Sequence, residues 1–221
     1  MASVTAVDYR TAAACLPAGS VLRADGVSWQ EYEQLLAALG EGYAVRIFYD
    51  RGKLEIMAPS EPHEGAKSYV HDLVVAIRDE LDIDVESRGS WTLKSERIAQ
   101  GAEADDCFYV QNAARIIGKG ELDLAHDPPP DLAVEVERTN ASLGKLAIYA
   151  ALGVPELWRV TSGGVRIFWL VDAGYEESEV SRAFPFLTAQ ALSRFLAQAQ
   201  REGGRKATRA FRVWLSEHGR I

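Results

Sequence analysis

Two short apolar segments that each carry acidic residues constrain the fold of this chain most. Asp105 and Asp106 precede the apolar run Cys107–Val110, and Glu135 lies inside the run Leu132–Val136. Runs this apolar are typical of strands that are buried on both faces, as in a sheet covered by helices. An ionised carboxylate in such a strand costs free energy unless it is paired or binds a metal ion. The sequence therefore predicts a covered sheet with a paired or metal-bound acid in each of two strands.

Length and composition favour one globular domain. The chain has 221 residues, of which 48% are hydrophobic and 25% charged, and a chain of this size can bury one sizeable core. We expect an N-terminal arm at residues 1–27, the main domain at residues 28–200 and a basic C-terminal helix at residues 201–221. The two cysteines, Cys15 and Cys107, lie far apart. This spacing argues against a disulfide framework and favours a reducing cytoplasm.

The periodicity of apolar residues predicts an alternation of strands and helices. In chain order the expected elements are a helix Trp29–Leu39, a hairpin around Asp50-Arg51-Gly52, a long amphipathic helix from Pro62 to Leu81, short strands at Ile83–Glu86 and Ser90–Leu93, buried strands at Cys107–Val110 and Leu132–Val136, a helix Ser142–Leu152, a hairpin around Ser162-Gly163-Gly164, and helices Ala189–Ala199 and Lys206–His218. This order indicates an α/β fold in which a mixed sheet is flanked by helices, with a C-terminal helical extension.

Alternation along the second buried strand gathers acids on one face. Asp131, Glu135 and Glu137 share that face, because successive side chains of a strand point to opposite sides. Mg²⁺ prefers hard oxygen ligands, so Asp105 and Glu135 from neighbouring strands are candidate ligands. Lys145, on the following helix, is the candidate for stabilising charge on a phosphate. A buried Glu135 paired with an arginine explains the residue equally well, whereas Asp131 fits a strand entry and Glu137 a strand exit.

The sequence argues against several other classes of function. The segment His63-Glu64-Gly65-Ala66-Lys67 begins like a zinc-binding HExxH motif, but Lys67 stands where the second histidine is needed. No GxSxG, P-loop or GxGxxG motif occurs. The net charge of −8 argues against a protein that coats nucleic acid by charge alone. It leaves room for a nuclease with an acidic metal site. The uncharged stretch 11–22 is too short to span a membrane, so no membrane anchor is expected.

Three segments resemble a known family. They are Gly101-Ala102-Glu103-Ala104-Asp105-Asp106-Cys107-Phe108-Tyr109-Val110, Asp127-Pro128-Pro129-Pro130-Asp131-Leu132-Ala133-Val134-Glu135-Val136, and residues 142–158, from Ser142-Leu143-Gly144-Lys145 to Glu156-Leu157-Trp158. Together they resemble the putative restriction endonuclease family abundant in cyanobacteria, within the PD-(D/E)xK nuclease superfamily. The resemblance covers roughly residues 30–196. It implies a restriction-endonuclease-like core and Mg²⁺-dependent cleavage of DNA, with Mn²⁺ as a possible substitute.

The resemblance also implies roles for single residues. Asp105 resembles the aspartate of the PD element, with Ala104 in place of the proline. Glu135 resembles the acid of the (D/E)xK element, but Glu137 stands at the position of its lysine. Lys145 then resembles a migrated lysine that reaches the site from the next helix. On these grounds we expect Lys145 to point toward Asp105 and Glu135.

The first long helix adds one more candidate residue for the metal site. Glu64 resembles the helical acid that many such nucleases add to the metal site, although a first-turn glutamate is also favoured by the helix dipole.

The predicted protein is therefore a cytoplasmic Mg²⁺-dependent DNA endonuclease, with a homodimer expected if both strands are cut. The alternative is a catalytically inactive nucleic-acid-binding or oligomeric module of the same fold.

Overall fold

The computed structural model describes residues 8–40, 43–137 and 144–219. Its helices are α1 Tyr9–Ala14, α2 Trp29–Leu39, α3 Glu61–Leu81, α4 Ala113–Ile116, α5 Lys145–Ala151, α6 Ala189–Glu202 and α7 Gly204–His218, with a 3₁₀ turn, η1, at Glu96–Ile98. Its strands are β1 Val21–Asp25, β2 Arg46–Asp50, β3 Lys53–Met57, β4 Glu86–Ser87, β5 Thr92–Ser95, β6 Gln100–Glu103, β7 Asp106–Tyr109, β8 Leu132–Val136, β9 Glu156–Thr161, β10 Gly164–Val171 and β11 Gly174–Ser178. The predicted α/β class and the C-terminal helical extension are confirmed.

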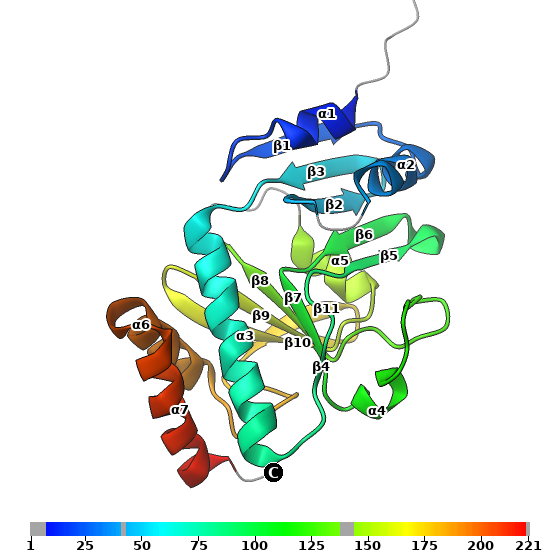
Figure 1. Cartoon of the computed structure of the whole chain (residues 1–221). Coiled ribbons are helices and arrows are strands. Elements are labelled where there is room, and N and C mark those ends of the chain that lie inside the picture. Colours follow the sequence, from blue (N-terminus) through cyan, green and yellow to red (C-terminus); the bar gives the residue numbers. More distant parts are fainter. Residues whose placement is uncertain (1–7, 41–42, 138–143, 220–221) are drawn as a thin grey trace, which may run out of the picture.

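The strands form two sheets rather than one. The N-terminal sheet has five strands in the order β1-β3-β2-β6-β5, and the central sheet has six in the order β11-β10-β9-β8-β7-β4. Within the central sheet β8 and β9 are parallel, whereas the other pairs are antiparallel. The chain passes from one sheet to the other between β6 and β7 (Figure 1). Ala104 and Asp105 are the two residues at this junction.

Helices cover the central sheet in the way its apolar strands require. On one face, Leu132, Val134 and Val136 of β8 pack in a cluster with α3, α6 and α7, and these helices lie side by side in Figure 1. On the other face, Ala133 of β8 packs with Ile148 and Tyr149 of α5 and with side chains of the N-terminal sheet. Both faces of β8 are therefore buried, as its composition predicts.

Local sequence signals set the limits of the best-predicted elements. Helix α2 begins after Ser28, whose Oγ accepts from the Glu31 backbone N–H at 3.2 Å. The Glu31 carboxylate accepts from the Ser28 N–H at 2.7 Å. This reciprocal capping box stabilises a helix by about 1 kcal/mol, and Gly40, with φ 71°, ends it. The predicted hairpin around residues 50–52 is confirmed as β2 and β3.

Other elements differ from the prediction. The strand expected at Ser90–Leu93 is β5, Thr92–Ser95, and it joins the N-terminal sheet through β6. The strand expected at Ile83–Glu86 is the short β4. The helix expected from Ser142 is described from Lys145 onward, and residues 142 and 143 lie outside the described residues. Strand β1 lies within the stretch predicted as an arm and pairs with β3. The pairing joins residues about thirty positions apart, which local periodicity does not reveal.

The two C-terminal helices pack against each other, and α7 lies alongside α3 (Figure 1). Phe211 and Leu215 of α7 are buried in the cluster that includes α3 and α6. Arg212 Nη1 lies 2.8 Å from Glu80 Oε1 on α3. Arg205 and Arg209 are exposed. Helix α7 therefore presents Arg205 and Arg209 to solvent on one side and buries Phe211 and Leu215 on another, with Arg212 paired to α3.

Gly101 of β6 leads to a prediction about stability. A Cβ at this position would lie 2.3 Å from the Tyr32 Oη and 2.9 Å from its ring carbon. The Tyr32 ring is fully buried and stacked on Tyr49 at 4.8 Å, so it cannot retreat without repacking. We expect Gly101→Ala to lower the free energy of unfolding by about 1–3 kcal/mol, the usual cost of overpacking. Urea unfolding followed by circular dichroism measures this change.

The matched control is Gly65→Ala in α3. A Cβ at Gly65 meets nothing within 4 Å. Alanine is favoured over glycine inside a helix by roughly 0.5–1 kcal/mol. The control should therefore raise stability while Gly101→Ala lowers it. Equal stability of the Gly101→Ala variant and the native protein would contradict the close approach of Tyr32.

Candidate active site

The acids singled out by the sequence meet where the two sheets and the first turn of α3 come together. Asp105 lies at the junction, and Glu135 is on β8. Asp106 pairs with Val134 in the antiparallel register of β7 and β8, and Asp105 directly precedes β7. The Asp105 N–H donates to the Val134 carbonyl at 3.1 Å, and the Asp105 Oδ2 accepts from the Val136 N–H at 2.8 Å. These two contacts are made to the residues on either side of Glu135, which explains how the two carboxylates come to share one site.

Asp105 is 1% exposed and fully engaged. Its Oδ2 accepts from the Val136 N–H at 2.8 Å and lies 3.0 Å from His63 Nε2, while its Oδ1 accepts from Arg46 Nε at 3.2 Å. Burial alone would raise the pKa of Asp105, but the contact with His63 and the Val136 N–H lowers it below its usual value. Asp105 is therefore held as a carboxylate.

Glu135 pairs with two side chains of α5. Its Oε2 accepts from Lys145 Nζ at 2.9 Å, and its Oε1 accepts from the Tyr149 hydroxyl. Lys145 also lies 3.8 Å from the centre of the Phe48 ring. Burial raises the pKa of Glu135 to about 7, against the lowering effect of the Lys145 charge. Burial alone would lower the pKa of Lys145, but the charge of Glu135 raises it.

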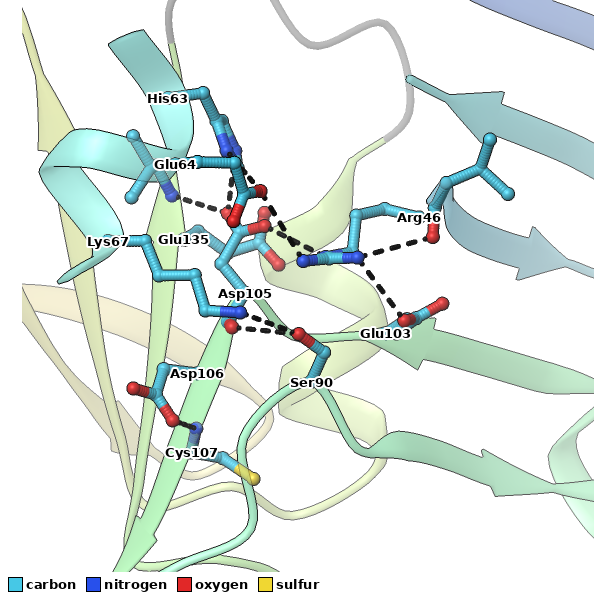
Figure 2. Close-up of polar contacts among 12 residues, drawn as sticks. Arg46, His63, Glu64, Lys67, Ser90, Glu103, Asp105, Asp106, Cys107 and Glu135 are labelled. Carbon is cyan, nitrogen blue, oxygen red and sulfur yellow. Dashed lines mark hydrogen bonds and ion pairs between the residues drawn. The ribbon is translucent and has the colours of Figure 1, made fainter. Parts of the chain in front are cut away.

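Arg46 and Glu103 enter the site from the N-terminal sheet. Arg46 Nη1 lies 3.6 Å from Glu103 Oε1, and Arg46 Nη2 lies 3.6 Å from Glu64 Oε1. Glu103 also accepts from the Tyr43 hydroxyl at 2.9 Å. Burial raises the pKa of Glu103 to about 7. Figure 2 shows the guanidinium of Arg46 between Glu103 on one side and Asp105 and Glu64 on the other.

The first turn of α3 supplies His63 and Glu64. Glu64 is 47% exposed at its side chain and is the most open acid of the site. The ring of His63 is buried, and its Nδ1 lies 3.4 Å from Glu64 Oε1. Neither nitrogen of His63 makes a well-aligned hydrogen bond among the described residues. Burial alone would lower the pKa of His63, but the adjacent Asp105 raises it.

The charges of this cluster suit a divalent cation. Four carboxylates, of Glu64, Glu103, Asp105 and Glu135, face the permanent cations of Arg46 and Lys145. The acids outnumber these two cations, which favours the addition of a further positive charge. The donors are hard oxygens of the type that Mg²⁺ prefers. The residues therefore fit such an ion in chemistry and charge.

The geometry of the described chain is not a ready-made ligand cage. In residues 8–40, 43–137 and 144–219, no three His, Cys, Asp or Glu side chains converge in an arrangement that could hold a metal ion. The reason is visible in the contacts, since Arg46 holds an oxygen of Asp105 and Lys145 holds one of Glu135. Metal binding here requires at least one of these ion pairs to rearrange.

The remaining acids of this region hold the structure together. Asp131 accepts from the backbone N–H groups of Val110 and Asn112, each at 2.8 Å, as expected for a residue at a strand entry. Glu137 pairs with Arg159 of β9. Among the described residues, no hydrogen bond or ion pair of Asp131 or Glu137 joins the cluster around Asp105, although the charge of Glu137 acts on Lys145.

Sequence reasoning missed Arg46, His63, Glu103 and Tyr149. The sequence does contain a pattern that could have indicated Arg46. This arginine directly precedes the apolar run Ile47-Phe48-Tyr49, just as Asp106 directly precedes the apolar run Cys107–Val110. Glu103 stands between two alanines in the same block as Asp105. His63 and Tyr149 carried no comparable signal, because a histidine in a first turn and a tyrosine on a helix are common in any core.

The arrangement of two sheets, a long covering helix and acids at a strand junction belongs to the restriction-endonuclease-like class of folds. Residues 29–217 match the Uma2 family, described as putative restriction endonuclease. The chain therefore belongs to this family, and the resemblance seen in its sequence is confirmed. No protein with a curated description matches the sequence.

A solved structure supports the fold. The crystal structure of a putative nuclease belonging to DUF820 from Anabaena variabilis is similar to this chain, with a TM-score of 0.52 and 16% sequence identity. The similarity covers 77% of this chain and 99% of that chain. At this identity the likeness concerns the fold alone.

In the described part of the chain, no helix has the length and apolar character needed to cross a membrane.

Proposed function

We propose that this chain is a Mg²⁺-dependent endonuclease that hydrolyses DNA phosphodiester bonds. The observation that carries the proposal is the pairing of Asp105 and Glu135. Asp105 directly precedes β7, and Glu135 lies on the neighbouring strand β8. Both carboxylates are buried, and the buried ammonium of Lys145 contacts Glu135. Membership of the nuclease family supports the same reading.

The proposed roles follow from the contacts. Asp105 and Glu135 hold the ion, and the half-exposed Glu64 completes its ligands from the first turn of α3. A bound Mg²⁺ or Mn²⁺ supplies positive charge that activates water and polarises the phosphate. Lys145 orients Glu135 through its 2.9 Å contact and offers its ammonium to charge that develops on the phosphate. Tyr149 fixes the second oxygen of Glu135.

A plasmid assay tests this function. Supercoiled plasmid is incubated with the protein and Mn²⁺ or Mg²⁺, with EDTA as the negative control and a labelled RNA of matched length as the competing substrate. We expect nicked and linear DNA only with metal. Calorimetry with Mn²⁺ on the native protein and on Glu135→Ala measures binding separately from cleavage. Absence of both cleavage and Mn²⁺ binding in the native protein would reject the proposal.

One observation favours a second candidate function. Glu137 occupies the position of the motif lysine and pairs with Arg159 instead of facing the site. A catalytically inactive nucleic-acid-binding or oligomeric module would keep the ion pairs of its acids for the fold alone. Such a module binds DNA equally with and without metal, and its Glu135→Ala variant differs from the native protein in stability only.

The exposed arginines of α7 lead to a prediction about DNA binding. Arg205 and Arg209 are exposed, whereas Arg212 is paired with Glu80. If both exposed side chains contact phosphates, Arg205→Ala/Arg209→Ala should reduce the slope of log affinity against log salt by about two units. Fluorescence anisotropy in EDTA, where no cleavage occurs, measures this slope. Arg212→Ala is the matched control and should leave the slope unchanged.

An unchanged slope in the double variant would assign α7 to packing alone. The full helix is retained in this test because Phe211 and Leu215 are buried, so truncation would expose the core.

A nuclease that cuts both strands is expected to act as a two-fold dimer. Light scattering of the native protein, alone and with duplex DNA, measures that property.

A further inference from the structure

A guanidinium already lies among the carboxylates of the candidate site. Arg46 is the first residue of β2, and its side chain is 8% exposed. Its Nε donates to Asp105 Oδ1 at 3.2 Å, while its two terminal nitrogens lie 3.6 Å from Glu64 and Glu103. The first contact is a hydrogen bond and the other two are charge pairs at longer range. Arg46 therefore balances negative charge on three acids at once.

Two of these three acids are ligands in the proposed function. An oxygen of Asp105 that accepts a hydrogen bond from Arg46 is not available to a metal ion in the same geometry. Two cations close together in a poorly screened interior also repel each other. Arg46 and a divalent ion consequently cannot both occupy this position.

The third acid offers Arg46 another place. Arg46 and Glu103 belong to neighbouring strands of the N-terminal sheet, β2 and β6, whereas Asp105 lies at the junction and Glu64 on α3. Glu103 is 4% exposed and is fixed by the Tyr43 hydroxyl at 2.9 Å. A guanidinium that leaves Asp105 can remain paired within its own sheet, because Glu103 lies on its other side (Figure 2).

We propose that Arg46 is the internal counter-ion of the metal-free site, that it competes with a divalent cation for Asp105 and Glu64, and that Glu103 retains it when the cation binds. The inference rests on the proposed function and adds a control of metal occupancy to it. Arg46 thereby keeps the acids folded inward without metal and sets the metal concentration at which the site fills. It acts through these carboxylates as a positioning residue.

Replacement of Arg46 tests the competition through metal binding. We expect Arg46→Met to bind Mn²⁺ about tenfold more tightly than the native protein by calorimetry, which corresponds to about 1.4 kcal/mol. Arg46→Lys keeps the charge but cannot span three acids with one ammonium, so its affinity should fall between the two. Lys94→Met is the matched control. It removes a cation of the same sheet that pairs with Glu33 at 2.9 Å, and its affinity should equal that of the native protein.

A second variant protects the test against loss of folding. Removing one partner of a buried ion pair is strongly destabilising because it leaves the other charge buried and unpaired, so Arg46→Met alone can unfold. Arg46→Met/Glu103→Gln removes one charge of each sign and keeps the cluster's net charge. It should fold and should retain the tighter Mn²⁺ binding. Circular dichroism verifies folding before each titration.

A direct readout follows the guanidinium itself. The Arg46 Nε–H signal in a ¹⁵N-correlated NMR spectrum, identified by its absence in Arg46→Lys, should shift when diamagnetic Mg²⁺ is added. The signal should report loss of the hydrogen bond to Asp105. No shift at a Mg²⁺ concentration that fills the site would overturn the inference.

The outcomes separate this inference from the proposed function. Native protein that binds Mn²⁺, with equal or weaker binding by the folded Arg46 variants, overturns the role of Arg46 and leaves the metal site intact. Weak binding by the native protein and tight binding by the variants supports both. No binding by the native protein or by folded Arg46→Met/Glu103→Gln rejects the metal site, and with it the competition.

Discussion

Asp105→Asn should lose DNA cleavage by about 10³-fold or more while keeping its fold. The substitution keeps the shape of the side chain but removes the charge that a divalent ion needs. Loss of several kcal/mol of charge stabilisation corresponds to a rate factor of this size. Plasmid nicking under saturating Mn²⁺ measures the rate, and calorimetry on the same sample should show weakened Mn²⁺ binding.

Asp106→Asn is the matched control for this prediction. Asp106 is equally buried at 1% exposure and adjoins Asp105 in the chain. It pairs instead with His71 at 2.8 Å, on the face of β7 that α3 covers. The control should therefore cleave within a few-fold of the native rate. Equal losses in both variants would point to general damage at the start of β7 and would remove the support for Asp105 as a ligand.

Lys145→Met should reduce cleavage by about 10²–10³-fold, as expected when one preorganised charge partner is removed from an active site. Stability should also fall, because Glu135 loses a buried partner at 2.9 Å. Glu135→Gln/Lys145→Met should recover much of the stability without recovering cleavage. This non-additive pattern separates the structural and chemical roles of the pair. Thermal unfolding and plasmid nicking on the same samples provide both measurements.

A second lysine provides the comparison. Lys94 of β5 pairs with Glu33 and is 40% exposed at its side chain, so Lys94→Met should cleave like the native protein. Full cleavage by folded Lys145→Met, with loss in Asp105→Asn, would reject the migrated lysine. Lys94 or another base would then take its place, and Lys94→Met would be the variant to lose activity.

Sequence patterns predicted those parts of the fold in which local chemistry is decisive. Helix α2 begins and ends at the predicted residues, because Ser28 and Gly40 act on their immediate neighbours. Strand β8 matches its predicted bounds, since an apolar run buried on both faces has no other stable environment. The edge strand β1 and the strand β6 were missed, because they owe their structure to partners far away in the chain.

The residues of the candidate site likewise fall into those that the sequence predicted and those that it did not. Asp105, Glu135 and Lys145 were visible as acids in apolar strands and as residues of a family pattern. Their proximity follows from the pairing of β7, which Asp105 directly precedes, with β8. Arg46 and Glu103 were not predicted, because a charge beside an apolar run does not reveal which buried group it pairs with.

The sequence by itself determined that this chain buries one acid inside a covered strand and another just before one, and that a lysine stands on the following helix, because apolar patterning and local spacing are properties of neighbouring residues. Only the tertiary structure decided what surrounds them. The passage of the chain from one sheet to the other at Asp105 brings Arg46, from a strand some sixty residues earlier, to within 3.2 Å of that carboxylate. Contacts of this kind depend on the packing of whole sheets, and packing is decided only when all the elements meet.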